Sequence, residues 1–343
     1  MSNLLDPLKV SSYHYDLPDE LIASSPTFPK GEQKLLVYER TSDKIHHAKF
    51  KDIFDFIPKE SAVLLNDTKV IKARIYGKKD TGGKVELLLN SPLPNDTYIV
   101  YIKGKVKVGT KLFFQNNLTS IVKKLNDDGT RVVEFYLNKQ KLNFQKLTSI
   151  LESIGHVPLP PYIKRDDNKE DETNYQTLFA KTPGAVAAPT ASLHFDEDSF
   201  KKLKSLYETR YITLHVGAGT FKSIEVDDIT KHTMHKEYYH IPQESLSLID
   251  SNKPILAVGT TVTRTIEYYI REKKQTGESD LFLHPLNKPK RVNYLLTNFH
   301  LPSSTLIMLV ASFTSLEKTL FLYNQAIEKR YKFYSYGDSM LII

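Results

Sequence analysis

The chain has 343 residues, of which 40% are hydrophobic and 25% charged; this excludes an intrinsically disordered protein and allows a large core, divided more naturally between two domains than one. The absence of cysteine excludes disulfide bonds and thiolate metal ligands. The net charge of +7 indicates an anionic partner, with nucleic acid the leading candidate, although AT-rich genomes give lysine-rich proteins without such a partner.

Neither a targeting segment nor a membrane span is predicted. The start, MSNLLDPLKVSSYHYDLP, has an acidic residue and a proline where a signal peptide needs a continuous apolar run. The longest late apolar run, residues 306–313, is too short to cross a bilayer. We therefore expect a cytoplasmic protein.

Short alternating runs between residues 61 and 136 predict about six antiparallel strands. TGG at residues 81–83 and NDDG at residues 126–129 each separate two such runs, and both have the chemistry of hairpin connections. A further pair of runs, TYIVYIK and TKLFFQ, flanks GKVKVG. The simplest closure of these strands is a small barrel, followed by a helix over residues 142–154 and the extended linker GHVPLPPYIKR.

The pattern then changes to strand followed by helix. YITLHV (residues 211–216), ILAV (255–258) and NYLLTN (293–298) are nearly continuous apolar runs, typical of strands buried on both faces. Helices are predicted over residues 196–209, 262–274, 303–313 and 316–329, with Asp196 and Ser303 as N-caps. The predicted fold is an α/β main domain (residues 1–60 and 152–343) with an inserted small antiparallel β-barrel domain (residues 61–151).

The loops after the three apolar strands indicate a shared ligand site. In open α/β sheets, ligands bind beyond the carboxyl ends of the strands, where glycines allow close approach and helix N-termini offer free N–H groups. Each loop alone also fits an ordinary turn or helix cap. The predicted ligand contacts in these loops are Gly217, Gly219, Thr220, Gly259, Thr260, Thr261 and Asn298.

Three histidines at segment ends, His194, His215 and His300, are candidates for proton transfer, because imidazole titrates near neutral pH. A buried structural histidine is the alternative for any one of them. Arg264 lies in the first turn of a predicted helix, where a positive charge opposes the helix dipole. Such a position is typical of an arginine that binds an anion, and an ordinary surface salt bridge is an equal alternative. His232 and His235 lack the other ligands of a metal site, so we expect no metal.

Two features favour nucleic acid. The lysines of YIKGKVKVGTK all occupy odd positions: Lys103, Lys105, Lys107 and Lys111. On an extended chain they would project from one face, either as a basic stripe that contacts phosphates or as an ordinary solvated strand face. Tyr336, in YKFYSYGDS, is placed either to stack on a base or to pack in the core.

Taken together, several motifs resemble, in order and spacing from about residue 15 to residue 340, the S-adenosylmethionine:tRNA ribosyltransferase-isomerase family of queuosine biosynthesis. They are LNDTKVIKARIYG, SIGHVPLPPYI, NYQTLFAKTPGAVAAPTASLHF, TLHVGAGTF, HTMHKEYY, LLTNFHLPSSTLIMLV and FYSYGDSM. The chain departs from the family pattern at Lys69, at Val262-Thr263 after GTT, and at Leu283-His284-Pro285-Leu286.

The resemblance implies transfer and isomerisation of the ribosyl unit of S-adenosylmethionine onto 7-aminomethyl-7-deazaguanine at the tRNA wobble position. The products would be epoxyqueuosine-tRNA, adenine and methionine, with no metal and no cofactor beyond the co-substrate, and the enzyme would be a monomer. A base removes a proton beside the sulfonium and adenine departs; His215 or His300 is the expected base, with His194 lining the pocket.

The same resemblance assigns the remaining site residues. Pro189, Thr190 and the glycine loops would contact S-adenosylmethionine, and Arg264 its methionine carboxylate. The small-residue stretch TPGAVAAPTASLHF (residues 182–195) would be a wall that excludes bulk. Asn66, Asp67 and Arg74 match a family motif, which leaves contact with the ligand or with the tRNA open. Together with the lysines and the tyrosine singled out above, the residues expected at the tRNA are Asn66, Asp67, Arg74, Lys103, Lys105, Lys107 and Tyr336.

Two other classes of protein stay open from the residues alone. A conventional S-adenosylmethionine methyltransferase would need an acidic residue ending a strand after the glycine-rich loop, and would release S-adenosylhomocysteine rather than adenine. A non-catalytic RNA-binding protein would use the basic barrel, and would keep its tRNA affinity after both His215 and His300 were replaced.

Overall fold

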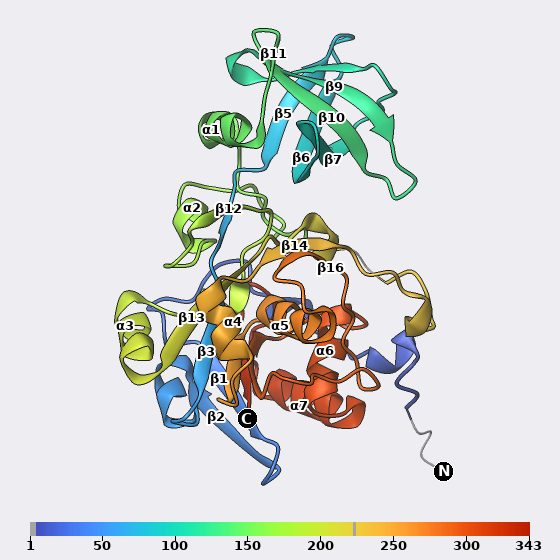
Figure 1. Ribbon diagram of the computed structural model, residues 1–343. Coiled ribbons are helices and arrows are strands. Elements are labelled where there is room, and N and C mark those ends of the chain that lie inside the picture. Colours follow the sequence, from blue (N-terminus) through green and yellow to red (C-terminus); the bar gives the residue numbers. More distant parts are fainter. Residues whose placement is uncertain (1–4, 222–223) are drawn as a thin grey trace.

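A computed structural model describes residues 5–221 and 224–343, apart from the side chains of residues 220 and 221. Two bodies are visible in Figure 1: a barrel drawn in cyan and green, and a larger α/β body that contains the C-terminus. The chain passes from the larger body into the barrel and back again, so the predicted fold, an α/β main domain with an inserted β-barrel, is confirmed.

The larger body is built on a mixed sheet of nine strands, counted over the described residues. Its order across the sheet is β16 (Thr276–Ser279), β14 (Glu237–His240), β13 (Glu208–Leu214), β3 (Ala62–Asn66), β15 (Ile255–Val258), β17 (Tyr294–Asn298), β18 (Ser339–Ile342), β1 (Lys34–Glu39) and β2 (Lys44–Lys49). The four central strands β13, β3, β15 and β17 run parallel, so their carboxyl ends meet at one edge.

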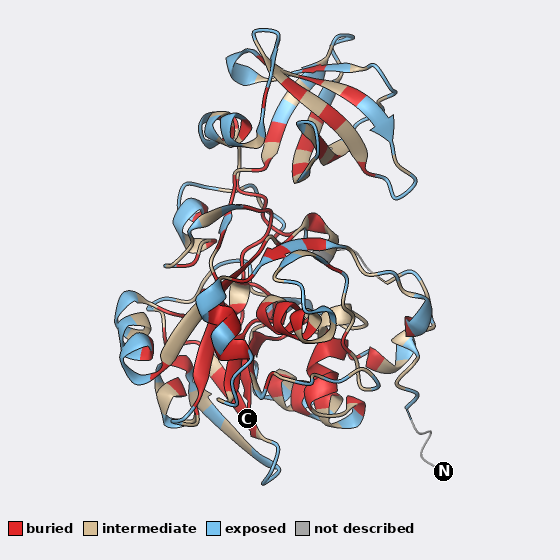
Figure 2. Cartoon of the chain, viewed as in Figure 1, coloured by how far each residue is buried: buried red, intermediate tan, exposed pale blue. Residues whose placement is uncertain are grey.

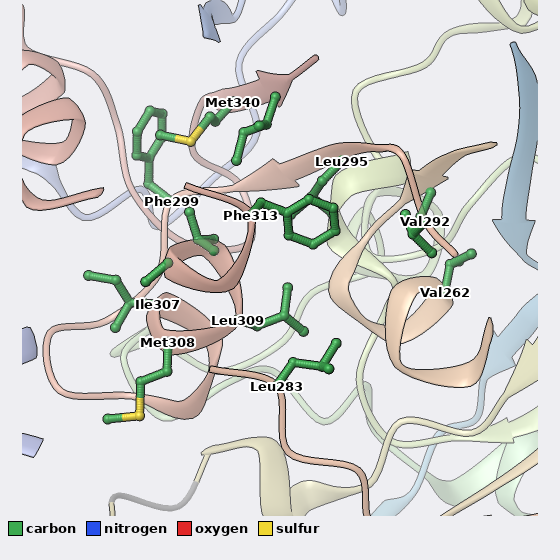
Figure 3. Packing of buried hydrophobic residues seen from close by; sticks show 14 of the residues in the cluster. Val262, Leu283, Val292, Leu295, Phe299, Ile307, Met308, Leu309, Phe313 and Met340 are labelled. Carbon is green, nitrogen blue, oxygen red and sulfur yellow. The ribbon is translucent and has the colours of Figure 1, made fainter. Parts of the chain in front are cut away.

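Two hydrophobic layers cover the two faces of this sheet. Alternate residues of β3 divide between them: Ala62 and Leu64 pack in one cluster, and Val63 and Leu65 in the other. The first layer includes residues of α4 (Gln243–Ile249), α5 (Thr260–Glu272), α6 (Thr305–Phe313) and α7 (Leu316–Glu328), and the second includes α3 (Glu197–Leu206). Figure 2 shows buried residues concentrated along the central strands and along α5 and α6, whereas α3 is mostly exposed, and Figure 3 shows Phe299, Leu309, Phe313 and Met340 in the first layer.

The barrel consists of β5 (Arg74–Lys79), β6 (Lys84–Leu93), β7 (Thr97–Lys103), β8 (Lys111–Phe113), β9 (Leu118–Leu125) and β10 (Arg131–Leu137), with the short β11 (Gln140–Lys141) at one end. Pairing of β9 with β10 closes it. Both predicted hairpins, β5–β6 and β9–β10, are confirmed. Helix α1 (Phe144–Ile154) buries Leu147, Leu151 and Ile154 against the barrel core, which explains its apolar spacing.

The barrel begins later in the chain than the boundary predicted at residue 61. AVLLN of β3 is buried at every position, as in a parallel sheet covered on both faces, and it belongs to the nine-stranded sheet. The next strand, β4 (Thr68–Val70), pairs with β12 (Thr182–Ala185) outside the barrel. The first strand in chain order that belongs to the barrel sheet is β5, which begins at Arg74.

Two local predictions also need correction. The N-cap of α6 is Ser304, whose side chain accepts from the Ile307 N–H, whereas Ser303 has a positive φ. The helix predicted over residues 196–209 ends at Leu206, because β13 already begins at Glu208. The short helix α2 (Asp171–Asn174) follows the predicted linker and was not predicted. Asp196 is the N-cap of α3, as expected.

Candidate active site

A cavity of about 380 Å³ lies at the carboxyl ends of β15 and β17. It is lined by the segment 187–191, by the loops that follow β15 and β17, and by residues 161–162, 175 and 334–335. This volume is within the usual range for small-molecule sites. The predicted site residues that line it are Pro189, Thr190, Gly259, Thr260, Thr261, Asn298 and His300.

Small side chains give the cavity its room. Ala187, Ala188 and Ala191 form part of its wall, and all three are buried. Gly259 has a φ of 100°, which disfavours any residue with a side chain, and a Cβ built there would lie 3.9 Å from the Cβ of Ala191.

The described lining residues include none with a full charge at neutral pH. The one imidazole among them, His300, is uncharged because burial lowers its pKa to about 3. Two aromatic side chains, Tyr162 and Tyr334, lie 4.2 Å apart between ring centroids at this wall, and sequence analysis had not singled them out. A cationic ligand would meet dipoles and aromatic rings here rather than carboxylates.

Asn298 presents a polar atom that has no protein partner. Both hydrogens of its Nδ2 are committed, one to the Nε2 of His194 at 3.2 Å and one to the carbonyl of Tyr334 at 3.0 Å. Its Oδ1 is buried and has no hydrogen-bond partner among the described residues. A buried polar atom without a partner costs about 1–3 kcal/mol, so this oxygen is suited to accept a hydrogen bond from a ligand.

His194 lies behind Asn298 and does not line the cavity. It is 2% exposed, and its ring lies tilted against that of Phe50 with centroids 5.0 Å apart. Burial, with a smaller contribution from Lys30, lowers its pKa to about 3. Its Nε2 must therefore be an acceptor for the Asn298 amide, which fixes which way that amide points. Sequence analysis expected His194 at the pocket surface; its structural position is one layer deeper.

His300 is held by both its ring and its backbone. Its Nε2 lies 2.8 Å from the Oγ1 of Thr297, and its N–H donates to the hydroxyl of Tyr323. The hydroxyl of Tyr15, far away in sequence, donates to its carbonyl. These contacts fix the imidazole at the cavity wall.

His215 lies outside the cavity, although its neighbour Val216 lines it. Its Nδ1 is 2.8 Å from the Oγ1 of Thr68, its ring stacks with Tyr238, and burial lowers its pKa to about 4. A Cβ on Gly184 would come within 2.8 Å of the ring, so β12 passes directly against it. His215 and His300 thus do not share one wall.

The glycine loop after β13 is engaged by protein groups. The N–H of Gly217 donates to Oε1 of Glu237, and Oε2 of the same carboxylate pairs with Arg264 at 2.6 Å. Arg264 also donates to the carbonyl of Leu281 and is only 6% exposed. The guanidinium expected to bind a substrate carboxylate is therefore already neutralised by Glu237, a partner that sequence analysis did not identify.

Gly219 and Arg264 line a smaller cavity of about 30 Å³ beside the large one. The two cavities share Thr305 and Leu306, so the loop lies behind that wall. A Cβ on Gly219 would lie 2.6 Å from the ring of His235. Thr220 belongs by its backbone to the same turn, but its side chain lies outside the described residues.

Several residues expected at the tRNA have structural partners. Asn66 is fully buried and bonds the backbone of Leu214 through both amide atoms. Asp67 accepts from the hydroxyl of Thr213 at 2.6 Å, and burial raises its pKa. Arg74 pairs with Glu86. Tyr336 is 4% exposed and donates to Asp171, so its ring is a core side chain and not a stacking surface.

The basic stripe is also corrected. β7 ends at Lys103, because Gly104 has a φ of 137° and turns the chain; Lys105 and Lys107 lie in the following loop. The lysines are exposed but do not share one strand face.

No group of three or more His, Asp or Glu side chains suited to a metal ion occurs among the described residues. In the same part of the chain, no single helix is both long and apolar enough to span a membrane; α6 and α7 meet that test only as a pair bent by 109°.

Comparisons with known proteins extend this picture. A family model described as "Queuosine biosynthesis protein" matches residues 10–342. The chain is 59% identical over 340 residues to the S-adenosylmethionine:tRNA ribosyltransferase-isomerase of Aliarcobacter butzleri, and 58% identical to that of Nitratiruptor sp., in each case over 99% of this chain and all of the relative.

A solved structure resembles the fold as well. The crystal structure of an S-adenosylmethionine tRNA ribosyltransferase from Thermotoga maritima is 31% identical, with a TM-score of 0.55 over 97% of this chain and 100% of that one. The cavity, the fold and these sequence matches agree: the chain belongs to the S-adenosylmethionine:tRNA ribosyltransferase-isomerase family of queuosine biosynthesis.

Proposed function

We propose that the chain transfers and isomerises the ribosyl moiety of S-adenosylmethionine onto 7-aminomethyl-7-deazaguanine at the tRNA wobble position, giving epoxyqueuosine-tRNA, adenine and methionine. The names of its close relatives support this activity. The observation in the chain itself that carries it is the uncharged cavity of about 380 Å³ at the strand ends, with the unpartnered Oδ1 of Asn298 in its wall. The enzyme is proposed to act as a monomer in the cytoplasm.

In this proposal the cavity holds S-adenosylmethionine. The Oδ1 of Asn298 accepts a hydrogen bond from the adenine amino group or the methionine ammonium, and His194 keeps the amide in that orientation. Tyr162 and Tyr334 lie where their rings can face the sulfonium cation. The alanine wall excludes water from the reacting ribose.

His300 is the general base of this proposal, since it is the imidazole that lines the cavity. It is uncharged at neutral pH, because burial lowers its pKa to about 3, and so it has a lone pair to take the proton beside the sulfonium. The same low pKa makes neutral His300 a weaker base than an ordinary imidazole, so its role relies on the acidity that the sulfonium gives to the adjacent proton. It also makes the imidazolium formed a stronger acid, suited to protonating the departing adenine. His215, outside the cavity, is the alternative base on the side of the second substrate.

The test is incubation of the purified chain with S-adenosylmethionine and a tRNA that carries 7-aminomethyl-7-deazaguanine, followed by mass spectrometry of bases and nucleosides. We expect adenine to be released in step with an epoxide-bearing nucleoside, and no adenine when the tRNA carries unmodified guanine. S-adenosylhomocysteine as product would identify a methyltransferase instead. tRNA binding without either product would identify a binding protein.

An Asn298→Leu variant, matched with Asn293→Leu just before the same strand, separates cavity binding from folding. Asn293 directly precedes β17, at the end of the strand away from the cavity, and its Oδ1 accepts from the Ile255 N–H. We expect Asn298→Leu to raise the KM for S-adenosylmethionine at least tenfold and Asn293→Leu to leave it unchanged. Equal KM values for S-adenosylmethionine in the two variants would show that Asn298 does not contribute to its binding.

A further inference from the structure

The barrel strand β6 contains an irregularity that re-aims one side chain. Leu89 pairs with Val100 and Ser91 pairs with Ile99, so Asn90 is an extra residue with no partner across the strand pair. Such a β-bulge turns its side chain out of the ordinary alternation and is frequent near functional sites. Neither the sequence pattern nor the expected site residues had indicated Asn90.

The side chain of Asn90 reaches out of the barrel to the glycine loop of the larger body. Its Oδ1 accepts from the N–H of Ala218 at 2.9 Å, between residues 128 positions apart. A Cβ built on Gly217 would lie 3.3 Å from the same oxygen, so a larger residue at position 217 would crowd this contact. Ala218 itself is buried among the apolar residues of the barrel core.

The loop is therefore held from two sides. Asn90 of the barrel binds the N–H of Ala218, and Glu237 of the nine-stranded sheet binds the N–H of Gly217. These two N–H groups are spent on protein acceptors. The loop therefore connects the two bodies through these hydrogen bonds and does not offer these N–H groups to an anionic ligand; we call this contact the joint.

From this joint a short path leads to the cavity. Val216, which directly precedes Gly217, lines the cavity and accepts through its carbonyl from the N–H of Val186 at 2.8 Å and that of Ala187 at 3.3 Å. Ala187 also lines the cavity. A displacement of the loop is therefore a displacement of two neighbouring pieces of the cavity wall.

We propose that Asn90 is a positioning residue: the barrel uses its bulged carboxamide to fix the glycine loop and, through Val216, the wall of the substrate cavity. The proposal rests on the proposed function for its catalytic consequence, and on the hydrogen bond alone for its structural one. It makes the barrel part of the catalytic machinery rather than only a surface for tRNA.

Three variants test it. Asn90→Ala removes the acceptor, Asn90→Asp keeps an oxygen in the same place, and Asn116→Ala removes a different barrel asparagine, whose amide bonds Ser153 within the barrel and its helix. We expect Asn90→Ala to lower kcat/KM for S-adenosylmethionine about tenfold or more, because it strands a buried N–H. Asn90→Asp should retain activity within about threefold, and Asn116→Ala should match wild type.

Two further readouts exclude a general loss of folding. Binding of the modified tRNA should stay the same in Asn90→Ala, and the denaturation midpoint should fall by no more than the loss of one hydrogen bond explains, whereas a generally destabilised barrel would lower the midpoint further and weaken tRNA binding as well. Hydrogen exchange should quicken in peptides covering residues 216–219 and stay unchanged across β9 and β10. This readout does not depend on turnover, so it holds even if wild type releases no adenine, which would refute the proposed function alone.

Unchanged exchange at residues 216–219 in Asn90→Ala overturns the proposal. If wild type turns over, a kcat/KM of Asn90→Ala within twofold of the wild-type value also overturns the proposal. Failure of Asn90→Asp to restore activity, with its exchange restored, overturns the link from the joint to the cavity.

Discussion

Breaking the ion pair between Glu237 and Arg264 should cost the protein much of its stability. The two side chains are 5% and 7% exposed, and their closest N···O distance is 2.6 Å. Glu237→Gln keeps the shape of the side chain and an acceptor for the N–H of Gly217, but leaves the buried guanidinium without a counter-charge. Removing one partner of such a pair costs about 3–5 kcal/mol, out of a total of about 5–15 kcal/mol for a typical protein.

The assay is urea denaturation of wild type, Glu237→Gln, Arg264→Met and the double variant. Methionine retains the apolar stem of arginine without its charge, so the double variant no longer buries an uncompensated ion and should regain most of the lost free energy of unfolding. The coupling energy from this cycle then reports the pair itself.

The reasoning would be refuted if Glu237→Gln lowered the free energy of unfolding by less than about 1 kcal/mol. It would also be refuted if the double variant were no more stable than Glu237→Gln. Arg264→Met is also informative about function. If it raised the KM for S-adenosylmethionine strongly while stability stayed unchanged, Arg264 would face the ligand, as the sequence suggested, and Glu237 would be only its resting partner.

Three other changes are expected to have measurable effects. Ala188→Leu adds bulk to the cavity wall and should abolish S-adenosylmethionine binding in calorimetry with little change in the denaturation midpoint; unfolding instead would show tight packing there. Burial lowers the pKa of His194 and His300 to about 3, against about 6.5 in the unfolded chain, so unfolding takes up protons below pH 6.5. The free energy of unfolding should therefore fall by up to about 1.4 kcal/mol per histidine for each pH unit between pH 6 and pH 5. Denaturation curves that coincide at these two pH values would contradict this prediction. Gly184→Ala drives a Cβ to within 2.8 Å of the ring of His215 and should shift its imidazole NMR signals and cost about 1–3 kcal/mol; unchanged signals would mean that β12 yields.

What the sequence predicted well was local. TGG and NDDG specify hairpins because their residues tolerate the required turns, and both hairpins are in the barrel. The loops GTT and NFH follow apolar strands, so general rules for α/β sheets already bring Gly259, Asn298 and His300 to one edge.

What the sequence could not predict depends on distant partners. The carboxylate of Glu237 comes from another element, so Arg264 looked available for an anion. The sequence left Tyr336 open between stacking on a base and packing in the core, and only the position of Asp171, which accepts from its hydroxyl, decides for the core. The lysine stripe failed for a nearer reason: Gly104 takes a positive φ and ends the strand, a choice that alternation alone does not reveal.

The position of β18 has a consequence for how the protein is made. The strand Ser339–Ile342 lies inside the large sheet, between β17 and β1, and pairs in parallel with residues 35–38. At a synthesis rate of about 5–20 residues per second, the ribosome needs roughly 15–60 s to produce the stretch of about 300 residues between these partners. During that interval the barrel, contiguous in sequence from Arg74 to Lys141, can fold, while the β1–β2 hairpin waits with one edge unpaired. The nascent chain thus exposes an apolar strand for most of its synthesis, which makes β1 a natural segment for a chaperone to shield.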